Sequence, residues 1–125
     1  MKIFKVLICG DRNWHEDYVP AIRRVVRELK RRHGRHLVII EGGAPGVDSL
    51  AKEIAQKEDV HVCEVEALWK TRRKGAGPQR NDVMLALEPN KVVGIHRNWG
   101  SSKGTRDMCD KAENSGIRVQ RVRVK

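Results

Sequence analysis

The sequence has few aromatic side chains and no long apolar segment. Of its 125 residues, one is Phe, one is Tyr and three are Trp. No apolar run approaches the roughly 20 residues that a membrane-spanning helix needs. The apolar start of the chain, MKIFKVLICG, is too short for a signal peptide. We therefore expect a cytoplasmic protein with no membrane partner.

Cysteine is also scarce, which limits the kinds of stabilising site that the chain can build. The three cysteines, Cys9, Cys63 and Cys109, are far apart in the sequence. They form no C-x-x-C pair, and no Cys/His group has the spacing of a zinc site. Because Cys9 and Cys63 lie in apolar runs, we expect reduced, mostly buried thiols, with no metal and no cofactor.

The two common nucleotide-binding fingerprints are missing. There is no G-x-x-x-x-G-K-[ST] motif, and no G-x-G-x-x-G follows the first apolar run. These absences argue against an ATPase and against an ordinary NAD-dependent dehydrogenase.

Charge, in contrast, is abundant and strongly biased to one sign. Lys and Arg total 26 against 16 Asp and Glu, so the formal net charge is +10. This excess favours an acidic partner, such as a nucleotide or nucleic acid, although solubility alone explains such a surface equally well.

Apolar residues alternate between strand-like runs and helix-like spacing along the whole chain. In the helical segments they recur every three or four residues, whereas the strand-like runs are short and nearly continuous. The predicted strands cover residues 3–9, 36–41, 60–65, 91–96 and 117–124, and the predicted helices cover residues 17–33, 47–55, 80–87 and 105–115. In the third helix, Val83, Met84 and Leu87 are expected to face inward. This order predicts an α/β, Rossmann-like three-layer sandwich with a mainly parallel five-stranded sheet and helices on both faces. Residues 1–125 are expected to form one domain.

The loops that follow the first four strands hold most of the small and polar residues. In a parallel sheet these loops all emerge at the carboxyl edge, where ligands bind at the point at which the strand order reverses. Residues 10–14, 42–48, 67–81 and 98–105 are therefore expected to converge on one cleft.

Each loop offers groups that suit a phosphorylated ligand. Glycine backbone amides can approach a phosphate closely, and the following helix adds its positive dipole end. Arginine side chains can form paired hydrogen bonds to phosphate, and Asp48 suits either a helix cap or a ribose hydroxyl. The predicted ligand-binding residues are Gly10, Arg12, Trp14, Gly42, Gly43, Ala44, Gly46, Asp48, Trp69, Arg80, Asn81, Gly100, Ser101, Ser102, Gly104 and Thr105.

All three tryptophans follow a predicted strand. Trp14, Trp69 and Trp99 each lie in a loop at the proposed ligand edge. An indole there can stack on a base, or it can cover the core or form a subunit interface. The sequence leaves both interpretations open.

Four segments together resemble a known family. ICGDRNW, EGGAPGVDSLA, AGPQRND and GSSKGTRD, in this order, resemble the SLOG superfamily and within it the small stand-alone YspA-like members of phages and bacteria. The superfamily includes the LOG phosphoribohydrolases, the DNA-processing protein DprA and sensor domains for nucleotide-derived signals. The resemblance implies a Rossmann-like fold, a nucleotide or nucleotide-derived ligand, and a homodimer or higher homo-oligomer.

The chain departs from the hydrolase pattern at one informative position. Enzymes of the LOG type carry P-G-G-x-G-T-x-x-E with an assisting Glu, but here Met108 stands at that position. Asp107 is one residue earlier, which on a helix turns the side chain by roughly 100°. Asp107 and Glu41 are nevertheless the candidate catalytic acids. Glu41 ends a buried strand, where a carboxyl group can have a raised pKa.

Three functions therefore compete. The first is binding of a nucleotide-derived ligand by a sensor, carrier or sequestering protein, and the second is an N-glycosidase or phosphoribohydrolase. The third is nucleic-acid binding in the manner of DprA, with phosphate contacts from basic residues outside the loops. Those basic residues are Arg23, Arg27, Arg31, residues 70–74, Arg118, Arg121 and Arg123.

Overall fold

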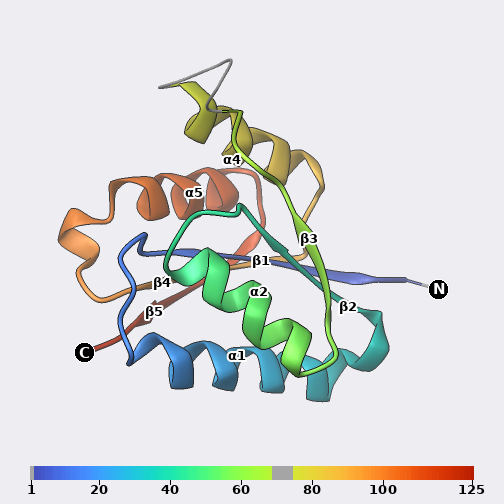
Figure 1. Cartoon of the computed structure of the whole chain (residues 1–125). Coiled ribbons are helices and arrows are strands. Elements are labelled where there is room, and N and C mark those ends of the chain that lie inside the picture. The colour runs from blue at the N-terminus through green and yellow to red at the C-terminus, as the bar shows by residue number, and fades with distance from the viewer. Residues whose placement is uncertain (1, 69–74) are drawn as a thin grey trace.

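The chain forms a parallel β-sheet with helices on both sides (Figure 1). The computed structural model describes residues 2–68 and 75–125. The strands are β1 (Phe4–Gly10), β2 (Leu37–Glu41), β3 (His61–Glu64), β4 (Lys91–His96) and β5 (Arg118–Arg123), in the spatial order β3-β2-β1-β4-β5. All four strand pairs are parallel. The predicted α/β Rossmann-like class is confirmed, with a wholly parallel sheet rather than a mainly parallel one.

Two helical layers cover the sheet. The helices are α1 (Tyr18–His33), α2 (Val47–Lys57), α4 (Ala76–Ala86) and α5 (Lys103–Asn114), with short 3-10 turns η1 (Gly34–His36) and η3 (Trp99–Ser101). In Figure 1, α1 and α2 lie below the sheet, whereas α4 and α5 lie above it. Among the described residues, no helix is both long and apolar enough to span a membrane.

The core consists of two apolar clusters, one on each face of the sheet. Alternate side chains of β1 point to opposite faces, so Val6 and Ile8 pack with α1 and α2, whereas Leu7 and Cys9 pack with α4 and α5. Burial on both faces explains why the inner strands are nearly continuous apolar runs. The chain reaches β3 on one side of β1 and then returns to β4 on the other side, so the order reverses between β1 and β4. This reversal is where the ligand site of such a sheet is expected.

Two helices begin earlier than the sequence predicts. Helix α4 begins at Ala76 instead of residue 80, and α5 begins at Lys103 instead of residue 105. Glycines and Pro78 resemble loop residues in sequence, but proline fits the first turn of a helix because its missing N–H has no partner there. As a result, Arg80 and Asn81 lie within α4 and Gly104 and Thr105 lie in the first turn of α5.

Three burial predictions are wrong. Val83 and Leu87 of α4 are 45% and 38% exposed, and only Met84 of the predicted apolar face is buried. Cys63 is also exposed. Cys63 pairs in register with Ile40, which contacts the α4–α5 layer, but β3 is an edge strand and this layer leaves its Cys63 uncovered.

Candidate functional site

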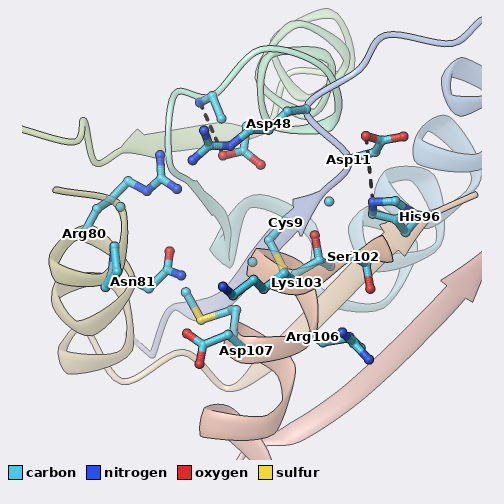
Figure 2. Close-up of a pocket in the computed structure, with 18 of the residues that line it drawn as sticks. Cys9, Asp11, Asp48, Arg80, Asn81, His96, Ser102, Lys103, Arg106 and Asp107 are labelled. Carbon is cyan, nitrogen blue, oxygen red and sulfur yellow. Dashed lines mark hydrogen bonds and ion pairs between the residues drawn. The ribbon is translucent and has the colours of Figure 1, made fainter. Parts of the chain in front are cut away.

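A pocket of about 790 Å³ opens at the carboxyl edge of β1 and β4, between α4 and α5 (Figure 2). Its volume lies within the usual range for small-molecule sites, roughly 300–1,000 Å³. The end of β1 forms part of its floor, and the first turns of α4 and α5 form two of its walls. The pocket is therefore at the position that the strand order favours.

The pocket brings together most of the predicted site residues. Those that line it are Gly10, Arg12, Ala44, Asp48, Arg80, Asn81, Ser101, Ser102, Gly104, Thr105 and Asp107. Those that do not line it are Trp14, Glu41, Gly42, Gly43, Gly46 and Gly100. Trp69 and residues 70–74 lie outside the described residues.

The glycine loop after β2 already uses its amides within the protein. The Asp48 Oδ2 atom accepts hydrogen bonds from the N–H groups of Gly42 and Ala44, at 3.2 and 3.3 Å. The Glu41 Oε1 atom accepts one from Gly43 N–H at 2.6 Å. Asp48 makes no capping bond to α2, whose N-cap is Gly46. Two side-chain carboxylates thus take the three amides that the sequence suggests for a phosphate.

Glycine at position 46 is required by loop packing. Gly46 has a φ of 80°, and a Cβ atom there would collide with the Asp11 carbonyl oxygen. The adjacent Val47 N–H donates to this same oxygen at 2.9 Å. The loops after β1 and β2 therefore touch backbone to backbone, which only a residue without a side chain permits.

Arg80 connects α4 to the loop after β2. Its Nη1 donates to the Gly42 carbonyl oxygen at 3.0 Å, and its Nε is buried without a hydrogen-bond partner in the described chain. Burial lowers the pKa of Arg80, whereas the nearby Asp48 carboxylate opposes this shift. Burial in turn raises the pKa of Asp48 to about 6, against the opposing effect of Arg80.

A second network of polar side chains, made of Tyr18, Asp11 and His96, connects the loops after β1 and β4. Tyr18 donates its O–H to Asp11 Oδ2 at 2.7 Å and accepts the Arg97 N–H at 2.9 Å. Asp11 Oδ1 accepts the Asn13 N–H at 3.0 Å and lies 3.7 Å from His96 Nε2. Because His96 Nδ1 accepts the Asn98 N–H, the ring proton belongs on Nε2, facing Asp11. Asp11 and His96 are drawn together in Figure 2.

The protonation of this group follows from its contacts. Partial burial acts to raise the pKa of Asp11, but hydrogen bonds from Asn13 and Tyr18 outweigh it and leave the pKa lowered. Burial and the bond to Asp11 raise the pKa of Tyr18 to about 12. Asp11 is thus a carboxylate at neutral pH and is suited to accepting hydrogen bonds rather than to moving protons.

The first turn of α5 lines the pocket with residues whose backbone amides lack a partner within the helix. Its N-cap, Ser102, makes no capping bond, because its Oγ donates to the Trp99 carbonyl oxygen at 2.7 Å. The N–H groups of the first turn, from Lys103 to Thr105, have no intrahelical partner by helix geometry. No acidic residue lies in this turn. The helix dipole and the Lys103 ammonium therefore make this end of the pocket favourable for an anion.

The two candidate catalytic acids occupy different environments. Asp107 lines the pocket, is 46% exposed, and its Oδ2 lies 3.2 Å from Lys111 Nζ. Glu41 is fully buried outside the pocket lining, and burial together with the Glu64 carboxyl raises its pKa to about 8. Met108, at the position of the assisting Glu in LOG enzymes, is 1% exposed and lines the pocket.

The described tryptophans do not line the pocket. Trp14 is 64% exposed. Trp99 packs against the cluster under α5 and donates its Nε1–H to the Val122 carbonyl oxygen at 3.3 Å. Trp99 therefore covers the core, as one of the two interpretations predicted. Within residues 2–68 and 75–125, no cluster of His, Cys, Asp and Glu could hold a metal ion.

About half of the lining is not among the predicted ligand-binding and catalytic residues, although Asp11, Asn13, Gly77, Pro78 and Lys103 lie in the loops that were predicted to converge. The additional residues are Cys9, Asp11, Asn13, Gly77, Pro78, Met84, His96, Lys103, Arg106, Met108, Asp110 and Lys111. His96 and Asp11 could have been found, because they end or directly follow the two strands at the reversal point. The methionines could not, because their spacing on α4 and α5 is that of ordinary core residues.

Comparison with known proteins supports both the fold and the family. No curated protein matches the sequence significantly. The X-ray structure of DNA processing protein A (DprA) from Streptococcus pneumoniae is similar in fold, with a TM-score of 0.75 and 18% sequence identity. The match covers 95% of this chain and 50% of that chain, so this chain spans about half the length of that DprA chain. A model of the YspA, cpYpsA-related SLOG family (YAcAr) matches residues 4–71, more than half of the sequence. The chain therefore belongs to the YspA, cpYpsA-related SLOG family.

Proposed function

We propose that the protein binds a small phosphorylated ligand, a nucleotide or a nucleotide derivative, in the pocket between α4 and α5. The observation that carries the proposal is the uncapped first turn of α5, which opens into the pocket beside Lys103. An anion at this turn accepts hydrogen bonds from amides that have no other partner among the residues that the structure describes. The family supports a ligand of the nucleotide type.

The charges around the pocket support the same placement of the anion. Arg80 donates to the Gly42 carbonyl oxygen, and the nearby Asp48 carboxylate offsets part of the effect of burial on its charge. Arg12 and Lys103 are exposed at the pocket lining. We assign phosphate binding to the α5 turn with Arg12 and Lys103, and we assign to Arg80 the task of holding the loop after β2.

A retention experiment tests this proposal. Purified protein is incubated with nucleoside mono-, di- and triphosphates, cyclic nucleotides and ADP-ribose, and the bound and free fractions are then chromatographed. We expect at least one compound to be retained intact, and Lys103→Glu to abolish its retention. Arg24→Glu, an equal charge change on the exposed side of α1, is the control and should retain it. Failure of the parent protein to retain any compound, or unchanged retention by Lys103→Glu, contradicts the proposal.

A hydrolase is the second candidate, because Asp107 lines the pocket next to the proposed anion site. In such a reaction, water would replace the base at the sugar carbon, and the carboxylate would stabilise the positive charge that develops on the sugar. The same experiment would then yield free base and sugar phosphate in solution, and Asp107→Asn would stop their release. Intact recovery of every compound argues for binding alone.

Nucleic-acid contacts have less support from the described surface. Arg27 pairs with Glu58, Arg31 with Glu28, and Arg121 with both Asp110 and Glu113. Half of the basic residues that the sequence singled out, where described, are thus paired with neighbouring carboxylates. We therefore do not extend the proposal to a DprA-like role.

A further inference from the structure

We propose that the α4 wall of the pocket recognises the base of the ligand, and that the Asn81 side-chain amide reads the base through paired hydrogen bonds. This inference rests on the proposed function, because it requires that a nucleotide occupies the pocket. It assigns to α4 a role separate from that of the phosphate-binding turn of α5.

Asn81 is a largely buried residue whose amide has no partner among the described residues. Its side chain is 9% exposed and lines the pocket. It makes no hydrogen bond within the described part of the chain. Neither polar atom of the amide is among the fully buried atoms that lack a partner, so the amide remains accessible from the pocket to water or to a ligand. Asparagine is also a poor residue for the interior of a helix. Neither the stability of α4 nor the packing of the core explains asparagine at this position, whereas a ligand that pairs with the amide does.

The surroundings of Asn81 suit a flat heterocycle. Met84, one turn further along α4, and Met108 of α5 are each 1% exposed, and both line the pocket with Cys9. Methionine and cysteine sulfurs are polarizable and pack well against aromatic rings. These three side chains give the pocket an apolar surface besides the amide, as expected where a base inserts and its edge needs hydrogen bonds.

The opposite end of the ligand has its own groups. Thr105 is 7% exposed and lines the pocket, and its hydroxyl makes no hydrogen bond within the residues that the structure describes. It follows Lys103 and Gly104 in the first turn of α5. Figure 2 shows Asn81 on α4 and Lys103 on α5, on different walls of the pocket. A molecule with a phosphate at one end and a base at the other can bind to the first turn of α5 and to Asn81 on α4 at the same time.

The chemistry of the amide distinguishes a base from other groups. An asparagine side chain offers one acceptor and two donors in a plane, and nucleobases present adjacent donors and acceptors in a plane, such as N6 and N7 of adenine. Phosphate presents acceptors only, so it cannot pair with both sides of the amide. The residue thus sets which base is preferred, while the α5 turn binds the phosphate of every nucleotide.

The test is a comparison of affinities, measured by isothermal titration calorimetry for AMP, GMP, CMP, UMP and ribose 5-phosphate. The parent protein is expected to prefer one base over the others by at least about tenfold, the effect of one well-formed pair of hydrogen bonds. Asn81→Ala is expected to lose this preference and to bind all four nucleotides within about twofold of one another. Its affinity for ribose 5-phosphate should not change. Asn114→Ala, at the far end of α5, is the control.

Thermal unfolding separates this role from a structural one. Because the amide has no partner in the protein, Asn81→Ala should melt at the same temperature as the parent or higher. A parent protein that binds all four nucleotides equally, or an Asn81→Ala variant that keeps the parent's order of preference, overturns the inference while leaving nucleotide binding intact. A parent protein that binds none of the five compounds also overturns the inference, and the proposed function is overturned with it only if no compound of the wider retention panel is bound.

Discussion

Two buried carboxylates, Glu41 and Asp48, hold the loop after β2 in the place where the sequence suggests a phosphate. They accept hydrogen bonds from the amides of Gly42, Gly43 and Ala44. Loops of this kind can bind an anion through their backbone N–H groups. Here the two carboxyl groups already accept hydrogen bonds from these N–H groups, so the loop needs no phosphate to satisfy them.

The raised pKa of Glu41 predicts a pH-dependent stability. Its pKa is about 8 in the folded protein against an ordinary value of 4.5, with burial as the main cause and the Glu64 carboxyl next. Between these values the folded state binds more protons than the unfolded state, so the free energy of unfolding falls as pH rises from about 5 to 8. The loss by pH 8 is on the order of a few kcal/mol.

Glu41→Gln isolates this effect because it mimics the protonated acid and keeps an acceptor for the Gly43 N–H. We expect the variant to be more stable than the parent at pH 8, with the difference shrinking toward pH 5. Urea unfolding at several pH values measures it. Parallel stability curves for the two proteins between pH 5 and 8 would show that Glu41 does not titrate in this range.

Asp48 is expected to matter for stability because two amides depend on it. Asp48→Ala leaves the N–H groups of Gly42 and Ala44 without their acceptor, at a cost of about 1–3 kcal/mol. Asp82→Ala removes an exposed carboxylate whose Oδ1 lies 3.4 Å from Lys111 Nζ and should change stability by less than about 0.5 kcal/mol. Urea unfolding at pH 7 compares them. Equal small losses in both variants would mean that water replaces Asp48 without cost.

At the scale of elements, α4 is the part that sequence analysis described least well. The sequence predicts three inward-facing residues, but only Met84 is buried, while Val83 and Leu87 are exposed. The apolar spacing of this helix is weak, because Arg80, Asn81 and Asp82 interrupt it. Which residues of α4 are buried depends on its position at the end of its helical layer. The sequence does not specify this position.

This arrangement predicts unequal effects for two neighbouring truncations. Met84→Ala removes a buried side chain between α4 and the sheet and should cost about 2–5 kcal/mol. Val83→Ala removes an exposed one on the same helix and should cost less than about 0.5 kcal/mol. Chemical unfolding of both variants tests the assignment. A larger loss of stability in Val83→Ala would mean that Val83, and not Met84, faces the sheet.

The strands and the site position were far more predictable than the helix starts. Strands buried on both faces are visible as apolar runs, and the carboxyl-edge rule then places their loops together without any knowledge of the ligand. Helix starts at Ala76 and Lys103 were missed because glycine and proline occur both in loops and in first turns. The pairing of Asp48 with Gly42 and Ala44 was missed because it depends on a tertiary fold of the loop that spacing does not specify.

At the scale of the whole molecule, some positively charged side chains lie next to one another on adjacent strands. Lys91 of β4 pairs in register with Arg118 of β5. Burial lowers the pKa of Lys91, and the positive charges of Arg118 and Arg32 lower it further. Like charges side by side on adjacent strands are destabilising. Electrostatic repulsion between these positive side chains therefore destabilises the amino edge of the sheet, which lies away from the pocket.

Relieving this repulsion should stabilise the protein. Lys91→Gln is expected to raise the melting temperature at low ionic strength, and the gain should shrink at high salt as screening weakens the repulsion. Arg24→Gln makes the same change in net charge on the exposed side of α1 and should have little effect. Equal gains for both variants would assign the effect to net charge rather than to this cluster.

The central claim is that the ligand's phosphate binds at the first turn of α5 and not at the glycine loop after β2. The most direct measurement is a titration of ¹⁵N-labelled protein with AMP and, separately, with inorganic phosphate, followed by amide NMR shifts. The account predicts that the amides of Lys103, Gly104 and Thr105 shift most with both compounds, while those of Gly42 and Gly43 move little. The largest shifts at Gly42, Gly43 and Ala44, with the α5 turn unmoved, would contradict it.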